Sequence, residues 1–478
     1  MSEPTFLWHD YETFGSDSRR DRPAQFAAIR TDAELVPCGD PIVAYCRLPE
    51  DVLPHPDAVL LTGITPQRAA REGVPEPEFA AIVDDALAEP GTCGAGYNSI
   101  RFDDEFTRNL LYRNFHDAYA REWENGNCRY DLIDVARLCY GLRPDGIEWP
   151  RRDDGTPSFR LEDLAAANGL AHARAHDALS DVEATLGLAQ RIRTAQRRLF
   201  DYSLTLRRKR QALALLDWNA RRPVVHASSR IPASRGCVTI VMPLAPLPGQ
   251  DSAVVVYDLT VDPTDLLALD VDAIRERVFA SRTDLPEGIE RIPLKIVRAN
   301  KCPALAPLGT LAGVDTARIA LDVDAALAHA ERLARDPEVA AKVAQVFARD
   351  RIETPTPDPE LALYGGTFLS DADRALLPRV RRATPDELAR GFPFQDARYA
   401  ELLFRYRARH FPATLAPDEQ ERWRRLRERR LTREDGLAAL TLPQYHARIA
   451  ELRADATPSQ HALLDALDAW GREIAATL

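Results

Sequence analysis

The sequence predicts a multi-domain α/β protein, and three features of the chain lead to this fold class. Its 478 residues are more than one hydrophobic core usually accommodates, so two or three domains are expected. In about the first 195 residues, strand-like runs come first and then alternate with helical patterns, which is typical of a mixed sheet flanked by helices. After them come short β-branched runs, a Pro-rich linker and a helical tail.

The first region opens with three predicted strands, over residues 6–12, 24–30 and 41–48. Thr65 before Pro66 has the pattern of an N-cap followed by proline at the first helical position, and it predicts a helix from 66 to 72. The other predicted elements of this region are a strand at 92–96 and helices at 77–88, 103–115, 131–141, 160–168 and 177–195.

The second region is predicted to be a small β-rich domain. A basic, helical connector at 197–222 leads into it. Its predicted strands are at 224–226, 238–241, 254–257 and 294–297.

The third region follows a Pro-rich linker at 353–359 and is helical. Residues 370–373 and 384–387 have the pattern of capping boxes, and the arginine-rich run 422–430 is typical of a solvated helix face. These changes of composition predict domains over 1–196, 197–352 and 353–478.

Composition limits the classes of function. The net charge is −11, whereas many nucleic-acid-binding proteins are basic, although a local arginine-lined groove can still bind a strand. No apolar run is long enough to span a bilayer, and the N-terminus lacks the features of a signal peptide, so a cytoplasmic protein without membrane contact is expected. The seven cysteines are dispersed and form no Cys-x-x-Cys pair, which indicates buried thiols rather than a zinc site.

Two carboxylates on the first predicted strand are candidate metal ligands. Asp10 and Glu12 are two residues apart, and the strand period of two places them on one face. They would repel each other unless a cation lay between them, and hard divalent ions such as Mg²⁺ take oxygen ligands of this kind. Taken alone, the pair also fits a solvated strand end.

Further candidates lie at the starts of two later helices. Asp103 opens the helix after the strand at 92–96, with Asp104 as a competing candidate, and an acid there also suits the helix dipole. Asp181 lies in the first turn of the last helix of this region, and His176 lies in the loop before it. A histidine with an ordinary pKa of about 6.5 can accept a proton from water at neutral pH. Taken alone, the His-x₄-Asp spacing also fits a structural role.

The combination is more specific than its parts, because two-metal phosphodiester hydrolysis needs several carboxylates and a group that activates water. Asp-x-Glu, a mid-domain Asp and His-x₄-Asp occur here in the order typical of the DEDDh 3′→5′ exonuclease superfamily. Within it, the chain resembles the bacterial exodeoxyribonuclease I family over essentially its whole length. The segments that carry the resemblance are His9–Gly15, Tyr97–Glu105, Trp149–Pro150, Ser158–Glu162, Ala175–Ala178 and Tyr364–Phe368.

This resemblance implies a ribonuclease H-like exonuclease domain, an SH3-like β-barrel domain and a helical C-terminal domain, the last two closing a clamp on a single strand. It implies a processive, monomeric enzyme that degrades single-stranded DNA from the 3′ end to 5′-mononucleotides in DNA repair and recombination. His176 would be the general base. The ligands of two Mg²⁺ ions, with Mn²⁺ as an alternative, would be Asp10, Glu12, Asp103 and Asp181.

The resemblance also implies roles in substrate binding. Glu12 would contact the terminal nucleotide and Arg160 would hold substrate phosphate near the metals, although an arginine at a helix start is also common on surfaces. Aromatic faces stack on bases whatever the sequence, and arginines contact phosphates; Tyr119 and Trp123 nevertheless also fit ordinary core aromatics. The positions that line the strand's path in the family correspond to Arg108, Tyr119, Trp123, Arg137 and Arg174.

One protein partner follows from the resemblance as well. The family binds the acidic C-terminal tail of the single-stranded-DNA-binding protein, and a basic pocket with an apolar floor suits such a peptide. Arg143 and Tyr202 are the candidates for that pocket.

Three other functions compete with this interpretation. An exoribonuclease or oligoribonuclease uses the same chemistry, but such chains are little more than a catalytic domain, and about 280 residues follow position 198 here. An inactive nucleic-acid-binding protein is a second alternative, and the presence of all five catalytic positions argues against it. A Cys–His hydrolase is the third, and no cysteine lies in a motif that supports it.

Overall fold

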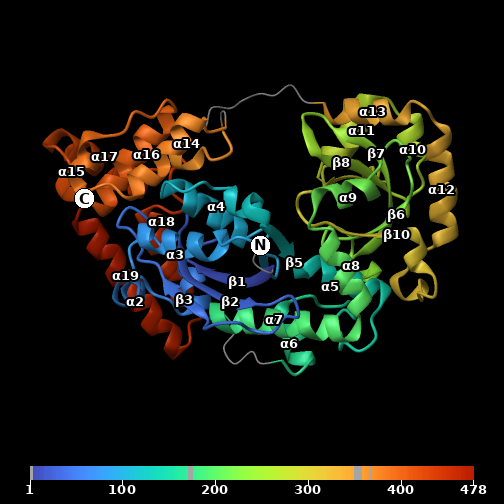
Figure 1. Ribbon diagram of the computed structural model, residues 1–478, viewed down its shortest axis with the longest axis horizontal. Coiled ribbons are helices and arrows are strands. Elements are labelled where there is room, and N and C mark those ends of the chain that lie inside the picture. Colours follow the sequence, from blue (N-terminus) through green and yellow to red (C-terminus); the bar gives the residue numbers. More distant parts are fainter. Residues whose placement is uncertain (1–3, 171–175, 282, 349–357, 366–367) are drawn as a thin grey trace. The chain divides into compact units, whose positions relative to one another are not determined.

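The computed structural model describes residues 4–170, 176–281, 283–348, 358–365 and 368–478 (Figure 1). The chain folds into two compact units. The first consists of Met1–Cys128, Ala173–Glu183 and Glu353–Leu478, and the second of Arg129–His172 and Ala184–Ile352. The first unit therefore joins the beginning and the end of the chain.

The sheet of the first unit has strand β1 in its interior. β1 (Thr5–Thr13) pairs antiparallel with β2 (Pro23–Thr31) on one side and parallel with β4 (Thr92–Gly96) on the other. β2 in turn pairs antiparallel with β3 (Ile42–Tyr45), so that the order is β3-β2-β1-β4. Because both edges of β1 are hydrogen-bonded, it is a rigid support for the side chains it carries.

The two faces of β1 have different surroundings. Leu7 and Tyr11 pack into an apolar cluster with side chains of helices α3 (Glu76–Ala88) and α4 (Asp103–Arg113). Since successive side chains of a strand alternate, the two carboxylates of the Asp-x-Glu pair point to the opposite face.

The C-terminal helices pack on the N-terminal part of the same unit. One apolar cluster contains Phe14 and Val59 together with Tyr445 and Leu464. Another joins the end of α4 to helices that follow residue 370. The helices of this part are α1 (Pro56–Thr62), α2 (Pro66–Glu72), α14 (Asp371–Arg381), α15 (Pro385–Arg390), α16 (Ala397–His410), α17 (Pro417–Thr432), α18 (Leu442–Arg453) and α19 (Pro458–Ala476).

Buried ion pairs reinforce this packing. Glu360 contacts Arg409, Arg430 at 2.8 Å and Arg22 at 3.4 Å, and Arg409 also forms a fork with Asp51 at 2.9 and 2.7 Å. Burial alone would raise the pKa of Glu360, but the arginines outweigh it and hold that pKa well below the ordinary value. Partners more than 300 residues apart in the sequence are thus joined by charge as well as by apolar contact.

The second unit contains a five-stranded antiparallel sheet with the order β10-β6-β7-β8-β9. Its core unites Tyr140 and Phe159 with strand residues such as Met242 and Val255. The strands are β6 (Val224–Ala227), β7 (Val238–Leu247), β8 (Gln250–Asp258), β9 (Leu294–Arg298) and β10 (Ala304–Pro307). The helices are α5 (Leu132–Leu142), α6 (Leu161–Ala167), α8 (Arg197–Thr205), α9 (Lys209–Leu215), α10 (Thr264–Ala268), α11 (Val271–Phe279), α12 (Val323–Arg335) and α13 (Val339–Phe347).

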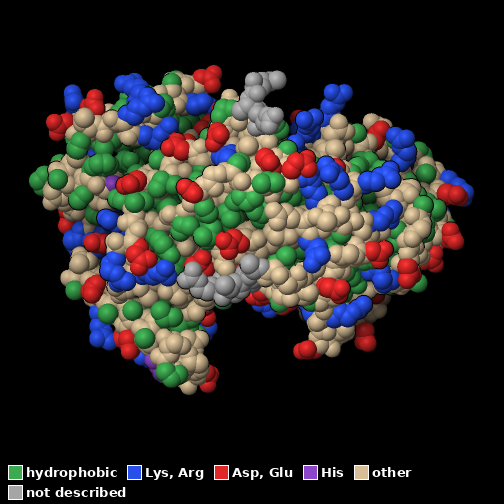
Figure 2. Space-filling view, turned by 60° about the horizontal axis from the view of Figure 1, so that its bottom comes forward, with side chains coloured by type: hydrophobic (Ala, Val, Ile, Leu, Met, Phe, Trp, Pro, Cys, Tyr) green, Lys and Arg blue, Asp and Glu red, His purple; other side chains and the backbone are tan. Residues whose placement is uncertain are grey.

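Two elements lie where the units meet along the chain. β5 (Cys128–Asp131) begins at the last residue of the first segment of unit 1, and α7 (Ala178–Ala195) begins in the first unit. In the part of the chain that the structure describes, no helix combines the length and the apolar character needed to cross a membrane. Acidic and basic side chains are interspersed over the face shown in Figure 2.

The structure confirms the predicted strands and helices of the first region, with ends shifted by a few residues. Thr65 caps α2 by accepting from the Arg68 N–H at 3.2 Å, and 384–387 forms a reciprocal capping box. The capping box predicted at 370–373 is wrong. The Ser370 hydroxyl accepts from the Asp373 N–H, but the Asp373 carboxylate accepts from two N–H groups near residue 395 instead.

The β-rich prediction for the second region is incomplete, because α10 to α13 also lie there. The longest of them, α12, is Ala-rich and begins with Asp322 as an N-cap that accepts from the Ala325 N–H at 2.9 Å. Both signals are present in the sequence and favour a helix. Helix α1 and strands β5 and β10 were also not predicted.

Replacing Glu360 with Gln should destabilise the protein by about 3–5 kcal/mol, because it leaves buried arginines without their counter-charge. Urea unfolding at pH 7 measures the change. Since the folded pKa of Glu360 is lowered, its contribution is complete above the unfolded value of 4.5 and is lost as the pH falls towards the folded value, so the difference should shrink in acid. The matched control is Glu421→Gln, which changes a partly exposed carboxylate that pairs with Arg424 and Arg425, and an equal effect of both variants would contradict the assignment.

Candidate active site

Strand β1 carries the first two candidate ligands. In the β1–β2 ladder Asp10 lies opposite Ala27 and Glu12 opposite Gln25, and both carboxylates point to the same face of the sheet. Glu12 is buried and Asp10 is partly exposed. The register of the ladder shifts between Glu12 and Thr13, so the strand pairing is irregular beside the site.

Helix α4 brings in the third carboxylate at its first residue. Asp103 Oδ1 accepts a hydrogen bond from the Tyr11 backbone N–H at 3.1 Å, which ties the start of the helix to β1 between the two strand carboxylates. Asp104 instead forms a 2.6 Å ion pair with Arg121, and both side chains are buried. The structure thus separates the two competing candidates, since Asp103 faces the β1 carboxylates and Asp104 is engaged by an arginine.

Helix α7 carries the fourth carboxylate, and the residue two positions before the helix is the histidine. The Asp181 N–H donates to the Asp177 carbonyl at 3.1 Å, which places Asp181 in the first turn. His176 has φ 62°, in the left-handed region that few non-glycine residues adopt. Ligand atoms of Glu12, His176 and Asp181 lie within 4.8 Å of one another. Asp10 and Asp103 lie outside this closest group.

Burial and mutual repulsion raise the pKa of both strand carboxyls. Burial, and then the other three candidate carboxylates, raise the pKa of Asp10 well above its ordinary value. Burial, followed by Asp181 and Asp103, raises the pKa of Glu12 to about 8. The four carboxylates therefore act as one electrostatic cluster, in which each added negative charge is unfavourable.

This donor set fits a hard divalent cation. Carboxylate oxygens are the ligands that Mg²⁺ and Mn²⁺ prefer, and imidazole nitrogen also binds several divalent metals. A cation would replace the repulsion within the cluster by attraction. Over the described residues, the group of Glu12, His176 and Asp181 is the one set of three acidic, histidine or cysteine side chains found at metal-ligand spacing.

Three of the predicted strand-path residues lie in the first unit. Trp123 is 62% exposed, so the alternative that it is a core aromatic is wrong. Tyr119 is half-buried beneath the Arg108 guanidinium, which lies 5.5 Å from its ring centroid. Arg108 is buried and forms a fork with Glu122 at 2.7 and 2.8 Å, so its charge is already paired.

Other predicted binding residues lie in the second unit. Arg137 is buried, donates to Asp134 at 2.5 Å and lies over the Phe159 ring at 5.5 Å. Arg160 is largely exposed at the start of α6 and pairs with Glu162. Arg174 is outside the described residues.

The two predicted partner-binding residues also lie in the second unit. Arg143 donates to the carbonyls of Leu142 and Thr310 at 2.6 and 3.2 Å. The half-buried Tyr202 packs against the cores of this unit, and within the described residues its hydroxyl has no hydrogen-bond partner.

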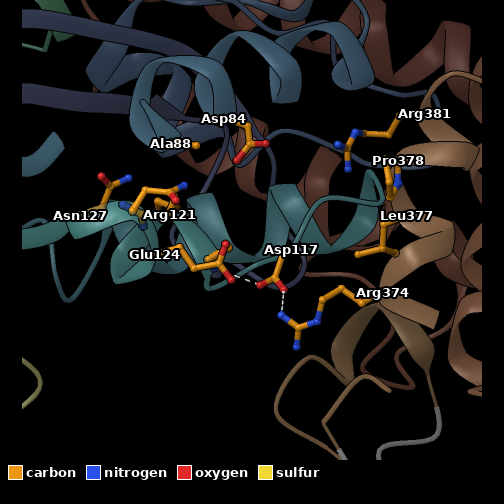
Figure 3. Close-up of a pocket in the computed structure, with 12 residues that line it drawn as sticks. Asp84, Ala88, Asp117, Arg121, Glu124, Asn127, Arg374, Leu377, Pro378 and Arg381 are labelled. Carbon is orange, nitrogen blue, oxygen red and sulfur yellow. Dashed lines mark hydrogen bonds and ion pairs between the residues drawn. The ribbon is translucent and has the colours of Figure 1, made fainter. Parts of the chain in front are cut away.

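A cavity of about 250 Å³ lies elsewhere in the first unit (Figure 3). It is lined by residues of α3, α14 and the two 3₁₀ turns Ala120–Glu122 and Glu124–Gly126. None of the five predicted catalytic residues lines it. Arg374 on its wall is paired with Asp117 at 2.6 Å. Because the cavity holds none of the catalytic candidates, the carboxylate cluster is the candidate active site.

A mixed sheet with Asp-x-Glu on an interior strand, an Asp at a helix start and a histidine before a last acidic helix together define an exonuclease domain of the DEDDh class. The Exonuclease family matches residues 7–189. The Exonuclease I SH3-like domain matches 207–349, and the Exonuclease I C-terminal domain matches 357–474.

Individual relatives match nearly the whole chain. Exodeoxyribonuclease I of Escherichia coli (strain K12) is 48% identical over 422 residues, which cover 88% of this chain and 88% of that protein. A structure of a moderately thermophilic exonuclease I from Methylocaldum szegediense is 50% identical, with a TM-score of 0.94 over 98% of this chain and 99% of that one. A zinc-bound complex of E. coli exonuclease I with single-stranded DNA is 45% identical, with a TM-score of 0.93 over 99% and 100%.

The chain belongs to the exodeoxyribonuclease I family. It is an enzyme of the exonuclease I type, and the predicted α/β fold class is confirmed, with its ribonuclease H-like, SH3-like and C-terminal helical parts.

Sequence reasoning missed residues that hold the site together. Arg121, which pairs with Asp104, lies 17 residues after it in the sequence and belongs to no motif. Gln25 lies opposite Glu12, and its side chain bonds to the start of α7. The pairing register that brings Gln25 there cannot be read from the chain alone, although the strand at 24–30 was predicted.

The variant Glu12→Gln should raise the melting temperature of the metal-free protein at pH 8.5 by about 2 °C or more. The folded pKa of Glu12 lies above the unfolded value of 4.5, so the folded state holds an extra proton between these values and stability falls as the pH rises through this window towards about 8. The gain should be small at pH 5. Thermal melts in EDTA at pH 8.5 and at pH 5 measure the two changes in melting temperature. The control is Glu183→Gln, which changes an exposed residue on α7.

Addition of Mg²⁺ completes this test. It should stabilise the wild type at pH 8.5 and the Glu12→Gln variant much less, because one negative ligand is missing. Equal stabilisation of both proteins by Mg²⁺ would mean that Glu12 does not bind the ion.

Proposed function

We propose that this protein is a Mg²⁺-dependent 3′→5′ exonuclease that degrades single-stranded DNA to 5′-mononucleotides. The observation that carries the proposal is the carboxylate cluster of Asp10, Glu12, Asp103 and Asp181 beside His176. The DNA substrate is supported by the relatives, one of which forms a complex with single-stranded DNA. The same relative holds a zinc ion, which supports a divalent-metal site in this family.

The carboxylates and the histidine of the cluster have different roles in this proposal. Asp10, Glu12, Asp103 and Asp181 bind two divalent ions, Mg²⁺ or alternatively Mn²⁺. When bound, such ions polarise the scissile phosphate and stabilise the charge that develops on it. His176 accepts the proton of the attacking water, and Glu12 also contacts the terminal nucleotide.

The strand itself is bound by side chains of the predicted path. Trp123 is the clearest of them, because an exposed indole stacks on a base without regard to sequence. Tyr119 is the second stacking candidate. Arg160 holds substrate phosphate near the metals, and its exposure leaves it accessible to a ligand. The arginines proposed to contact the remaining phosphates are Arg108, Arg137 and Arg174.

The proposed setting is that of a monomeric, processive, cytoplasmic enzyme in DNA repair and recombination. Its proposed domains are 1–196, 197–352 and 353–478, of which the last two close a clamp on the strand. We further propose that Arg143 and Tyr202 bind the acidic tail of a single-stranded-DNA-binding protein. The unpaired Tyr202 hydroxyl among the described residues supports a role in ligand binding.

The substrate is tested with three 5′-labelled polymers: single-stranded DNA, its duplex form and RNA of the same sequence. In Mg²⁺, shortening from the 3′ end is expected for single-stranded DNA alone, and EDTA should stop it. Comparable degradation of the RNA would replace the proposal by an exoribonuclease, and no cleavage of any polymer would indicate a nucleic-acid-binding protein.

The catalytic set is tested by Asp181→Asn and His176→Ala. Asp181→Asn should lower kcat by at least about 10³-fold because it removes a metal ligand, and His176→Ala by about 10²–10⁴-fold with little change in DNA affinity. Single-turnover rates and DNA-binding titrations separate the two effects. Glu183→Gln, exposed on the same helix, is the control. Full activity of Asp181→Asn would exclude it from the site.

A further inference from the structure

A row of side chains crosses three strands beside the candidate active site. Glu12 on β1 lies opposite Gln25 on β2, and Gln25 lies opposite Tyr45 on β3. Residues paired across antiparallel strands point to the same face of a sheet. The row therefore extends from a candidate metal ligand to the outer strand of this part of the sheet.

Gln25 is buried, and both ends of its amide are hydrogen-bonded. Its Oε1 accepts from the Ala178 backbone N–H at 3.2 Å, and its Nε2 donates to the Tyr45 hydroxyl at 3.1 Å. Ala178 is the first residue of α7, where backbone N–H groups lack partners within the helix. The Asp177 carboxylate caps α7 by accepting from the Ser180 N–H at 3.4 Å, and the Gln25 amide takes up a second N–H of the same turn, which ties the start of α7 to β2.

The Tyr45 end of the row is fixed in turn. Arg68 donates to the Tyr45 hydroxyl at 2.6 Å, and its guanidinium lies 4.9 Å from the centroid of the same ring. Glu72, one turn further along α2, pairs with Arg68 at 3.0 Å. Arg68 also attracts the Asp177 carboxylate electrostatically, so the row returns to the residue between His176 and α7.

We propose that Gln25, supported by Tyr45 and Arg68, is a positioning residue that sets where α7 begins and so holds His176 and Asp181 against Glu12. His176 lies two residues before the bonded N–H and Asp181 three residues after it. Their ligand atoms and one of Glu12 lie within 4.8 Å of one another. A shift of the helix start would move both residues together relative to β1. This inference rests on the proposed function.

The chemistry of the position favours an amide. An apolar residue would leave the buried Ala178 N–H without this acceptor, which is unfavourable, and would remove one hydrogen bond of the Tyr45 hydroxyl. A glutamate could still accept from Ala178, but it would add another carboxylate beside a cluster that already raises the pKa of Glu12 by repulsion as well as by burial. Glutamine supplies an acceptor and a donor without charge.

The test compares Gln25→Met with Gln67→Met in the full-length protein. Gln67 lies on α2 in the same unit, and its amide donates to the Ala466 carbonyl at 2.7 Å, away from the carboxylate cluster. Steady-state rates on a short single-stranded DNA give kcat and KM. Melting temperatures with and without Mg²⁺ give a readout that does not depend on turnover.

Gln25→Met should lower kcat by about 10–100-fold, the usual effect of removing a group that orients metal ligands, with KM within about twofold of wild type. Its Mg²⁺-induced rise in melting temperature should be smaller than that of the wild type. Gln67→Met should match the wild type in kcat and in this rise. A folded Gln25→Met with wild-type kcat, or an equal loss in both variants, would overturn the inference.

A second variant covers the case in which Gln25→Met does not fold. Tyr45→Phe keeps the ring beside Arg68 and removes only the hydroxyl, and it should lower kcat several-fold with KM unchanged. Wild-type kcat in Tyr45→Phe would then overturn the inference. If the wild type itself degrades none of the polymers, the proposed function fails. If the wild type is active and Gln25→Met and Tyr45→Phe have its kcat, only the positioning role fails.

Discussion

The constraint on which this structure depends is the need to hold four negative carboxylates close together where water only partly reaches them. Such a cluster opposes its own formation, as the raised pKa of Asp10 and Glu12 shows. The fold meets the constraint with rigid elements. Two carboxylates share one face of an interior strand, and two others lie at helix starts that hydrogen bonds tie to β1 and β2.

A second charge cluster in the same unit shows the opposite behaviour. Asp51 and Glu360 are as deeply buried as any acid of the candidate site, yet arginines lower the pKa of both. That cluster fastens the C-terminal helices to the N-terminal part of the unit. For Asp10 and Glu12 the neighbours that shift the pKa are other carboxylates. The contrast distinguishes a structural ion-pair network from a site that needs a cation from outside the chain.

Much of this could be predicted from the sequence because the signals are local. The Asp-x-Glu spacing on a strand, the N-cap at Thr65 and the acid that opens α4 each follow from one short segment. What could not be predicted depends on pairing between distant segments. The choice between Asp103 and Asp104 is made by Tyr11 and Arg121, and the role of Gln25 follows from strand register. The helix α12 was not predicted although its alanines and the Asp322 cap favour it, because it follows β-branched runs that are typical of a β-rich domain.

The central claim is that the four carboxylates and His176 form a divalent-metal site. Anomalous diffraction from crystals of the protein grown or soaked with Mn²⁺ tests it most directly, because the ions are then located without reference to activity. Anomalous peaks are expected about 2.0–2.6 Å from carboxylate oxygens of this cluster, with Asp10 and Asp181 among the ligands. Strong Mn²⁺ peaks elsewhere in the protein, with none beside these carboxylates, would contradict it.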